Sequence, residues 1–173
     1  LGRRDEAGDC YRAALAIRPD SAELQNNYAV LQAGMGQAGA AEQGYLRAVS
    51  LRPDYADAWH NLGLLYTQAG CYSRAEAALC RCVQARAGDP EAWNSLGNVY
   101  QHLQRDADAE NAYLRALAAH PTHAKTLNNL GTLRQRQGAA AAAEDAYRRA
   151  IDADPAYPEA RWNLGFLLLA KGR

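Results

Sequence analysis

The sequence repeats itself with a period of 34 residues, and this period constrains the fold more than any other feature. Glycine recurs at residues 2, 36, 70, 138 and 172, and only Gln104 interrupts the series. Two further series in the same register are Ala7, Ala41, Ala75, Ala109, Ala143 and Tyr11, Tyr45, Leu79, Tyr113, Tyr147. Periods of this length are typical of stacked supersecondary units, so the sequence predicts a solenoid.

Each period contains two helical patterns, and residues 56–86 show them most clearly. Trp59, Leu62, Gly63 and Tyr66 are spaced as one face of a helix, and Ala75, Leu79, Cys82 and Val83 repeat that spacing after Gly70. Glycine between the two patterns permits the positive φ that ends one helix before the next begins. The repeating unit is therefore predicted to be a helical hairpin.

These residues also match a known motif, W-x-x-L-G-x-x-Y, then G, then A-x-x-x-Y-x-x-A, then P. The match is carried by Trp59-Leu62-Gly63-Tyr66-Gly70-Ala75, and by Trp93-Leu96-Gly97-Tyr100 with Ala109-Tyr113-Ala116-Pro121. In this the chain resembles the tetratricopeptide repeat family over its whole length. The resemblance implies an all-α, right-handed superhelical solenoid of antiparallel helix pairs, here with about ten helices.

The period also predicts the domain organisation. We expect residues 1–21 to form the second helix of a truncated repeat, and residues 158–173 to form the first helix of a further repeat or a capping helix. Between them lie the expected complete repeats 22–55, 56–89, 90–123 and 124–157. Repeat positions are counted below from residues 22, 56, 90, 124 and 158. Because the last helix is apolar on nearly all sides, we expect the parent protein to continue past Arg173 or this end to self-associate through Phe166, Leu168 and Leu169.

Composition narrows the classes of partner. The net charge is zero, so no basic surface is expected for nucleic acid or an anionic membrane, and no segment resembles a signal peptide or a membrane span. The four cysteines lack the spacing of a disulfide or metal framework, which fits a reducing, cytoplasmic location. Arginine far exceeds lysine and alanine is abundant, a bias that we interpret as that of a GC-rich, bacterial genome.

Candidate binding residues follow from the resemblance, because in this family the first helices line a concave groove with their second, fifth, sixth, ninth, twelfth and thirteenth positions. Asparagine recurs at the sixth position, and its side chain can both donate to and accept from a peptide unit. The predicted groove residues are Asn27, Asn61, Asn94, Ser95, Asn98, Asn128, Asn129, Trp162 and Asn163. Two alternatives stay open: the asparagines bind peptide or bond locally between helices, and Trp162 is a groove anchor or a buried residue displaced from the fourth position.

The sixth-position series resembles the repeat arm of O-GlcNAc transferases, where such asparagines hold the substrate backbone. That resemblance would give the role to Asn27, Asn61, Asn129 and Asn163, whereas Ser95 departs from it. The main hypothesis is a non-catalytic scaffold that binds an extended peptide or a helix of a protein partner. The alternatives are the recognition arm of a bacterial O-GlcNAc-transferase-like glycosyltransferase and a self-assembling structural scaffold.

No set of residues predicts catalysis in this chain. His60 and His102 face the expected groove from opposite ends of their helices, and His120 and His123 lie in a predicted loop. No nucleophile, base and orienting group share a pocket by spacing, and we expect no metal and no cofactor. The lysine-based carboxylate clamp of some family members is also absent, because the fifth positions carry Asn26, His60, Asn94 and Asn128.

Overall fold

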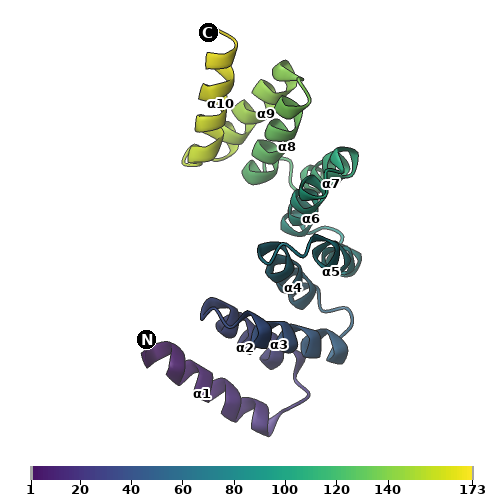
Figure 1. Ribbon diagram of the computed structural model, residues 1–173, viewed down its shortest axis with the longest axis vertical. Coiled ribbons are helices and arrows are strands. Elements are labelled where there is room, and N and C mark those ends of the chain that lie inside the picture. The colour runs from purple at the N-terminus through teal and green to yellow at the C-terminus, as the bar shows by residue number, and fades with distance from the viewer. Residues whose placement is uncertain (1, 173) are drawn as a thin grey trace. The chain divides into compact units, whose positions relative to one another are not determined.

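The computed structural model describes residues 2–172, and within them the chain is entirely α-helical apart from short turns (Figure 1). The ten helices of this range are α1 (Gly2–Ile17), α2 (Ala22–Gly34), α3 (Ala38–Leu51), α4 (Ala56–Gln68), α5 (Tyr72–Ala85), α6 (Pro90–His102), α7 (Asp106–Ala119), α8 (Ala124–Arg136), α9 (Ala140–Ala153) and α10 (Pro158–Ala170). The prediction of an all-α repeat fold of about ten helices is confirmed. Leu1 and Arg173, the ends of the first and last predicted segments, lie outside the described residues.

The chain divides into two compact units between Ala87 and Gly88. In unit 1, α2 packs on α3 and α4 packs on α5 as hairpins, α1 lies against α2, and α3 lies against α4. In unit 2, α6 packs on α7 and α8 on α9, while α10 packs on α9. Within each unit, first helices of successive repeats also meet, so their side chains can form one surface.

The turn inside each hairpin depends on a residue with positive φ. Gly36, Gly70 and Gly138 have φ values of 77°, 71° and 78°, as the glycine series predicts. Gln104, which interrupts that series, keeps the same turn with φ 58°. A side chain in this region costs about 1–2 kcal/mol, so the fold imposes this turn against a local penalty.

Glycine at the eighth position sets how closely the two helices of a hairpin approach. A Cβ added to Gly63 would lie 2.6 Å from Leu79 Cγ, and one added to Gly131 would lie 2.6 Å from Tyr147 Cε1. These distances are far below van der Waals contact. The large residue of the second helix therefore occupies the space above the glycine, and the two series in the sequence pack against each other.

Candidate functional site: polar face of the first helices

The sixth-position asparagines form hydrogen bonds between neighbouring repeats. The side-chain Nδ2 of Asn61 donates to Asn26 Oδ1 at 3.0 Å in unit 1. In unit 2, Asn129 Nδ2 donates to Asn94 Oδ1 at 3.0 Å, and Asn163 Nδ2 donates to Asn128 Oδ1 at 2.8 Å. Each of these bonds joins a sixth position to the fifth position of the preceding repeat. We refer to them as the inter-repeat amide pairs.

The fifth-position members of the pairs in unit 2 are buried. Asn94 is 5% exposed and Asn128 is 6% exposed, so little of either side chain is accessible, and their contact with a ligand stays a prediction. Asn94 Oδ1 also accepts from Thr126 Oγ1 at 3.2 Å, and two donors use both lone pairs of an amide oxygen. Asn94 and Asn128 thus position the side chains of Asn129 and Asn163 by accepting their hydrogen bonds.

The pairs reduce what the sixth-position asparagines can offer to a peptide. Asn129 Nδ2 donates a second bond to Asn98 Oδ1 at 3.0 Å, which uses both of its N–H groups and leaves Oδ1 as the group for a ligand. Asn61 and Asn163 each donate one N–H to their pair. Local bonding between helices, one of the two alternatives above, therefore accounts for much of the series, and the peptide ladder stays a prediction.

Ser95 is the exception in the sixth-position series, where the other repeats carry asparagine. The fifth position of the preceding repeat is His60, where the other repeats before a sixth-position asparagine carry Asn26, Asn94 or Asn128. Neither of these two sequence positions carries asparagine, so the sequence departs from the series at both.

A tyrosine adds polarity to the face of unit 2 in a way that sequence reasoning missed. Tyr113, from the second helix α7, is buried, and its hydroxyl donates to Asn98 Oδ1 at 2.7 Å. Gln101 Nε2 donates to the same hydroxyl at 2.8 Å. Burial raises the pKa of Tyr113, so the hydroxyl keeps its proton and can donate. The signal for this cluster was the combination of polar residues at positions nine and twelve with the tyrosine of the second helix.

The next repeat builds the same cluster with different residues. Tyr147 Oη donates to Gln135 Oε1 at 2.8 Å and lies 3.3 Å from Thr132 Oγ1. Burial again raises the pKa of this tyrosine. Two successive repeats therefore present a tyrosine hydroxyl framed by side chains of positions nine and twelve.

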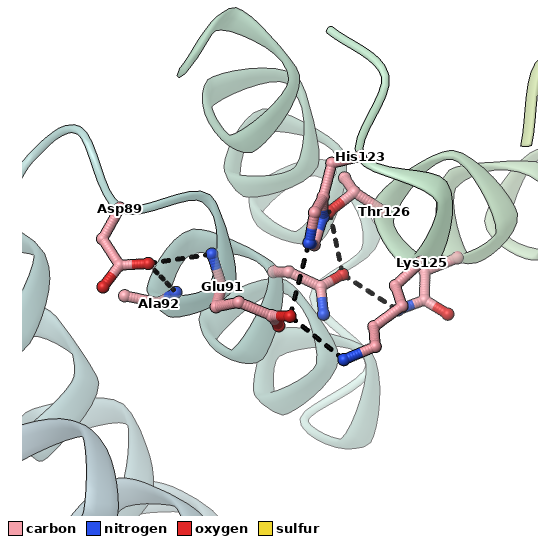
Figure 2. A network of polar contacts seen from close by, with 8 residues as sticks. Asp89, Glu91, Ala92, His123, Lys125 and Thr126 are labelled. Atoms are coloured by element: carbon pink, nitrogen blue, oxygen red, sulfur yellow. Dashed lines mark hydrogen bonds and ion pairs between the residues drawn. The ribbon is translucent and has the colours of Figure 1, made fainter. Parts of the chain in front are cut away.

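A charged network lies at the start of α6 and α8, as Figure 2 shows. Lys125 Nζ donates to Glu91 Oε1 at 3.0 Å, and His123 Nε2 lies 3.4 Å from the same oxygen. Burial acts to raise the pKa of Glu91. Hydrogen bonds and electrostatic attraction from Lys125 and His123 outweigh this effect, so the pKa of Glu91 lies below its ordinary value. The second-position Glu91 is thus an ionised partner of the neighbouring repeat, and His123 Nδ1 lies 2.6 Å from Thr126 Oγ1.

Trp162 is exposed, which excludes the buried fourth-position alternative. Its exposed fraction is 77%. The true fourth position is Arg161, which donates to Pro155 O at 2.9 Å as Trp59 Nε1 does to Pro53 O at 2.8 Å. Arg161 therefore performs the local role of the repeat tryptophan, and Trp162 is left on the surface.

A hollow of about 500 Å³ connects Trp162 with the polar face of unit 2. It lies between α8, α9 and α10 and is lined by Thr132, Gln135, Arg136, Tyr147, Trp162, Asn163 and Phe166. Arg136 is paired with Asp106, so the hollow carries little net charge. Its walls combine aromatic rings with amide and hydroxyl groups.

Comparison with known proteins identifies the class. Family models described as "Tetratricopeptide repeat" match residues 89–156 and 56–89, and one described as "TPR repeat" matches residues 35–70. The chain belongs to the tetratricopeptide repeat family. A comparison with curated protein sequences found no match to this chain.

Solved structures with this fold include two of MamA and one of YrrB. A crystal structure of MamA superposes with a TM-score of 0.81 at 21% identity, covering 89% of this chain and 90% of that chain. MamA residues 41 to the end from Desulfovibrio magneticus RS-1 give 0.80 at 19% identity, covering 89% and 87%. YrrB, described as "a TPR protein with an unusual peptide-binding site", gives 0.78 at 19% identity, covering 95% and 85%. At these identities the likeness shows the fold.

The described residues contain neither a candidate membrane span nor a candidate metal site. Across residues 2–172, no helix has the length and apolarity needed to cross a lipid bilayer. Over the same range, no three His, Cys, Asp or Glu side chains are grouped as metal ligands. By family and fold, the chain is a protein-interaction scaffold.

Proposed function

We propose that the chain binds an extended peptide of a protein partner, and that the hollow between α8, α9 and α10 is the main site. The observation that carries this proposal is the exposed Trp162 beside the Tyr147 cluster. A large exposed aromatic ring next to amide and hydroxyl groups has the composition of a binding hot spot. The described peptide-binding site of YrrB, on the same fold, supports the choice of a peptide as ligand.

The lining predicts the chemistry of the peptide. Trp162 and Phe166 offer aromatic surface to a large apolar side chain, which would be shielded from water on binding. Asn163 and Gln135 can bond the main chain on either side of that residue, since an amide side chain both donates and accepts. The paired Arg136 gives no preference for an acidic peptide. We expect an extended, weakly charged segment with one aromatic or large aliphatic anchor.

The test is a selection followed by affinity measurements. A library of displayed random peptides is selected on the immobilised chain, and enriched peptides are titrated by fluorescence polarisation against wild type, Trp162→Ala and Leu114→Ala. Leu114 is an exposed apolar residue of α7 outside the hollow and serves as the matched control. We expect Trp162→Ala to weaken binding by about tenfold or more and Leu114→Ala to leave it unchanged. Equal binding to both variants, or no enrichment, contradicts the proposal.

The recognition-arm alternative would use the sixth-position asparagines of the whole chain rather than one hollow. It is tested by Asn61→Ala combined with Asn129→Ala, measured with the same peptides and by circular dichroism. Several-fold weaker binding with intact helicity would support a peptide ladder. Because both side chains donate in inter-repeat amide pairs, we expect reduced thermal stability instead, with the affinity of the hollow largely retained.

A further inference from the structure

His123, the residue just before α8, contacts two side chains through opposite nitrogens of its ring (Figure 2). Its Nε2 lies 3.4 Å from Glu91 Oε1 on α6, and its Nδ1 lies 2.6 Å from Thr126 Oγ1 on α8. The Thr126 hydroxyl is fully buried and donates to Asn94 Oδ1 at 3.2 Å. We refer to Glu91, His123, Thr126 and Asn94 as the His123 bridge, because their contacts connect α6 with α8. The His123 side chain is 15% exposed, so water reaches the ring and its protons can exchange.

The His123 bridge needs three hydrogen atoms, because it contains three contacts between polar atoms. Its two ends are the carboxylate oxygen of Glu91 and the amide oxygen of Asn94, which both only accept. The hydroxyl of Thr126 supplies one hydrogen, and a neutral imidazole supplies one more. Only an imidazolium ring, which has an N–H on both nitrogens, supplies the third.

A neutral His123 ring therefore leaves one contact of the bridge without a hydrogen. With the proton on Nδ1, the lone pair of Nε2 faces the Glu91 carboxylate. With the proton on Nε2, the Thr126 hydroxyl turns to Nδ1, and its oxygen then meets Asn94 Oδ1 without a hydrogen between them. Two acceptors held together in this way cost free energy, most of all where water is excluded. Both neutral forms thus weaken the connection between α6 and α8.

We propose that the His123 bridge is a pH-sensitive contact between α6 and α8, complete when the ring of His123 carries two protons and interrupted when it carries one. Histidine is the side chain that ordinarily changes its charge between about pH 5 and 8. Because only the folded chain offers partners to both N–H groups, protonation of His123 favours the folded state. The stability that the bridge contributes is therefore present at the acidic end of this range and is lost as the pH rises.

The buried end of the bridge belongs to the polar face of the first helices. Asn94 Oδ1 also accepts from Asn129 Nδ2 at 3.0 Å, in one of the inter-repeat amide pairs. Loss of the hydrogen bond from Thr126 would leave Asn129 as the single donor to this oxygen. A change of pH at His123 thus reaches an amide pair of unit 2. The proposal does not depend on peptide binding in the hollow between α8, α9 and α10, because every contact of the bridge is internal to the chain.

Charges of both signs surround His123. Glu91 attracts a protonated ring, whereas Lys125, which donates to the same carboxylate oxygen, repels it. His120 has its ring centre 5.8 Å away and repels the ring too once both are protonated. Further charged or titratable side chains on the surrounding elements are Asp89 before α6, Arg149 and Asp152 of α9, and Tyr157 before α10. A pH dependence that requires the Thr126 hydroxyl therefore distinguishes the bridge from a simple ion pair.

The first test compares the loss of His123 with the loss of a neighbouring histidine. Wild type, His123→Gln and His120→Gln are unfolded with urea at about pH 5.5 and about pH 8 and followed by circular dichroism. We expect His123→Gln to raise the unfolding equilibrium constant about three- to tenfold more at the lower pH than at the higher. His120→Gln, at an exposed position of the same turn, should have nearly the same effect at both. An effect of His123→Gln that is equal at both pH values, or larger at the higher, overturns the proposal.

The second test removes the hydroxyl that makes the third hydrogen necessary. In the Thr126→Val background a neutral ring can satisfy Glu91 alone, whereas the control Thr126→Ser keeps a hydroxyl. Adding His123→Gln to each background measures how much of the His123 contribution depends on pH. We expect the three- to tenfold difference to fall below about twofold with Thr126→Val and to persist with Thr126→Ser. An undiminished difference with Thr126→Val would assign the pH dependence to the Glu91 charge alone and overturn the bridge.

Discussion

Tyr45 in unit 1 and Tyr113 in unit 2 occupy the same position of their repeats but contribute differently to the surface. Both are buried, at 3% and 0% exposure. Around Tyr45 the ninth and twelfth positions are Val30 and Ala33, whereas around Tyr113 they are Asn98 and Gln101, which bond its hydroxyl. Both repeats therefore bury the tyrosine ring in the same way. The residues at positions nine and twelve of the first helix determine whether the tyrosine hydroxyl joins a polar cluster.

The same contrast separates the first-helix faces of the two units more widely. Unit 1 presents Val30 and Leu64 at its ninth positions, both exposed and apolar. Unit 2 presents Asn98 and Thr132 there, each in contact with a tyrosine hydroxyl. A fold of equivalent repeats thus carries two different surfaces, and we place the peptide site on the polar one.

The largest expected effect comes from breaking the packing that both units share. Gly131→Ala puts a Cβ 2.6 Å from Tyr147 Cε1, so the ring must move and its hydrogen bonds to Gln135 and Thr132 are strained. We expect the free energy of unfolding to fall by about 1–3 kcal/mol, measured by urea denaturation with circular dichroism. Gly39→Ala, in an open helical position, should be neutral or stabilising. Equal stability of the two variants would contradict the role of the eighth-position glycine.

The comparison between the two tyrosines is sharpened by removing one oxygen atom from each. Tyr113→Phe leaves Gln101 and Asn98 without their shared partner and should cost about 1–2 kcal/mol in the free energy of unfolding. Tyr45→Phe should cost less than half of that, because the ninth and twelfth positions beside it are apolar. Urea denaturation of both variants measures the difference. Equal losses would show that the hydroxyl contributes alike in both units.

Tyr66 differs from Tyr113 because its hydroxyl donates to a carboxylate, that of Glu42, and a pH titration of tyrosinate absorbance tests this contact. Burial and the hydrogen bond to Glu42 raise the pKa of Tyr66 to about 12. Because the folded-state pKa is raised, the stability that Tyr66 contributes is complete below about pH 10 and is lost as the pH rises toward 12. Tyrosinate absorbance should show a step near pH 12 that Tyr66→Phe removes. Glu42→Gln should shift that step to lower pH, and an unshifted step would exclude Glu42 as a cause.

The smallest effect concerns the two ion pairs of Glu144, one with Arg148 within α9 and one with Lys171 just after α10. Hydrogen bonds from Lys171 and Arg148 lower the pKa of Glu144 to about 2. A lowered folded-state pKa means that the contribution is present above about pH 4.5 and is lost as the pH falls toward 2. Glu144→Gln should lower the melting temperature slightly at pH 7 and not at pH 2, with less effect in high salt. A salt-independent loss at both pH values would point to packing instead.

Much of the fold was predictable because periodic positions carry its packing. The glycine series predicted the turns, and Gln104 shows that the repeat frame, rather than the residue alone, sets positive φ. The polar face was harder to predict, because an asparagine at the sixth position looks the same in a sequence whether it bonds a peptide or a neighbour. Only the distances to Asn26, Asn94 and Asn128 revealed the inter-repeat amide pairs.

Two other features depended on contacts between helices that no single helical pattern contains. The hydroxyl of Tyr113 reaches the first-helix face from α7, so first-helix positions alone could not predict it. Trp162 was ambiguous because the sequence could not show that Arg161 bonds the Pro155 carbonyl in its place. In both cases the partner across the hairpin or loop decided the role of the residue.

A peptide site between α8, α9 and α10 is tested most directly by a ¹H–¹⁵N spectrum of the side-chain amides and indoles during titration with a peptide selected on the chain. The single variants Trp162→Phe, Asn163→Asp, Gln135→Glu, Asn27→Asp and Asn61→Asp each remove the signal of one residue and so assign it. We predict shifts at the Trp162 indole and at the amides of Asn163 and Gln135, with Asn27 and Asn61 unchanged. Shifts at Asn27 and Asn61 without those of unit 2 would contradict a peptide site in this hollow.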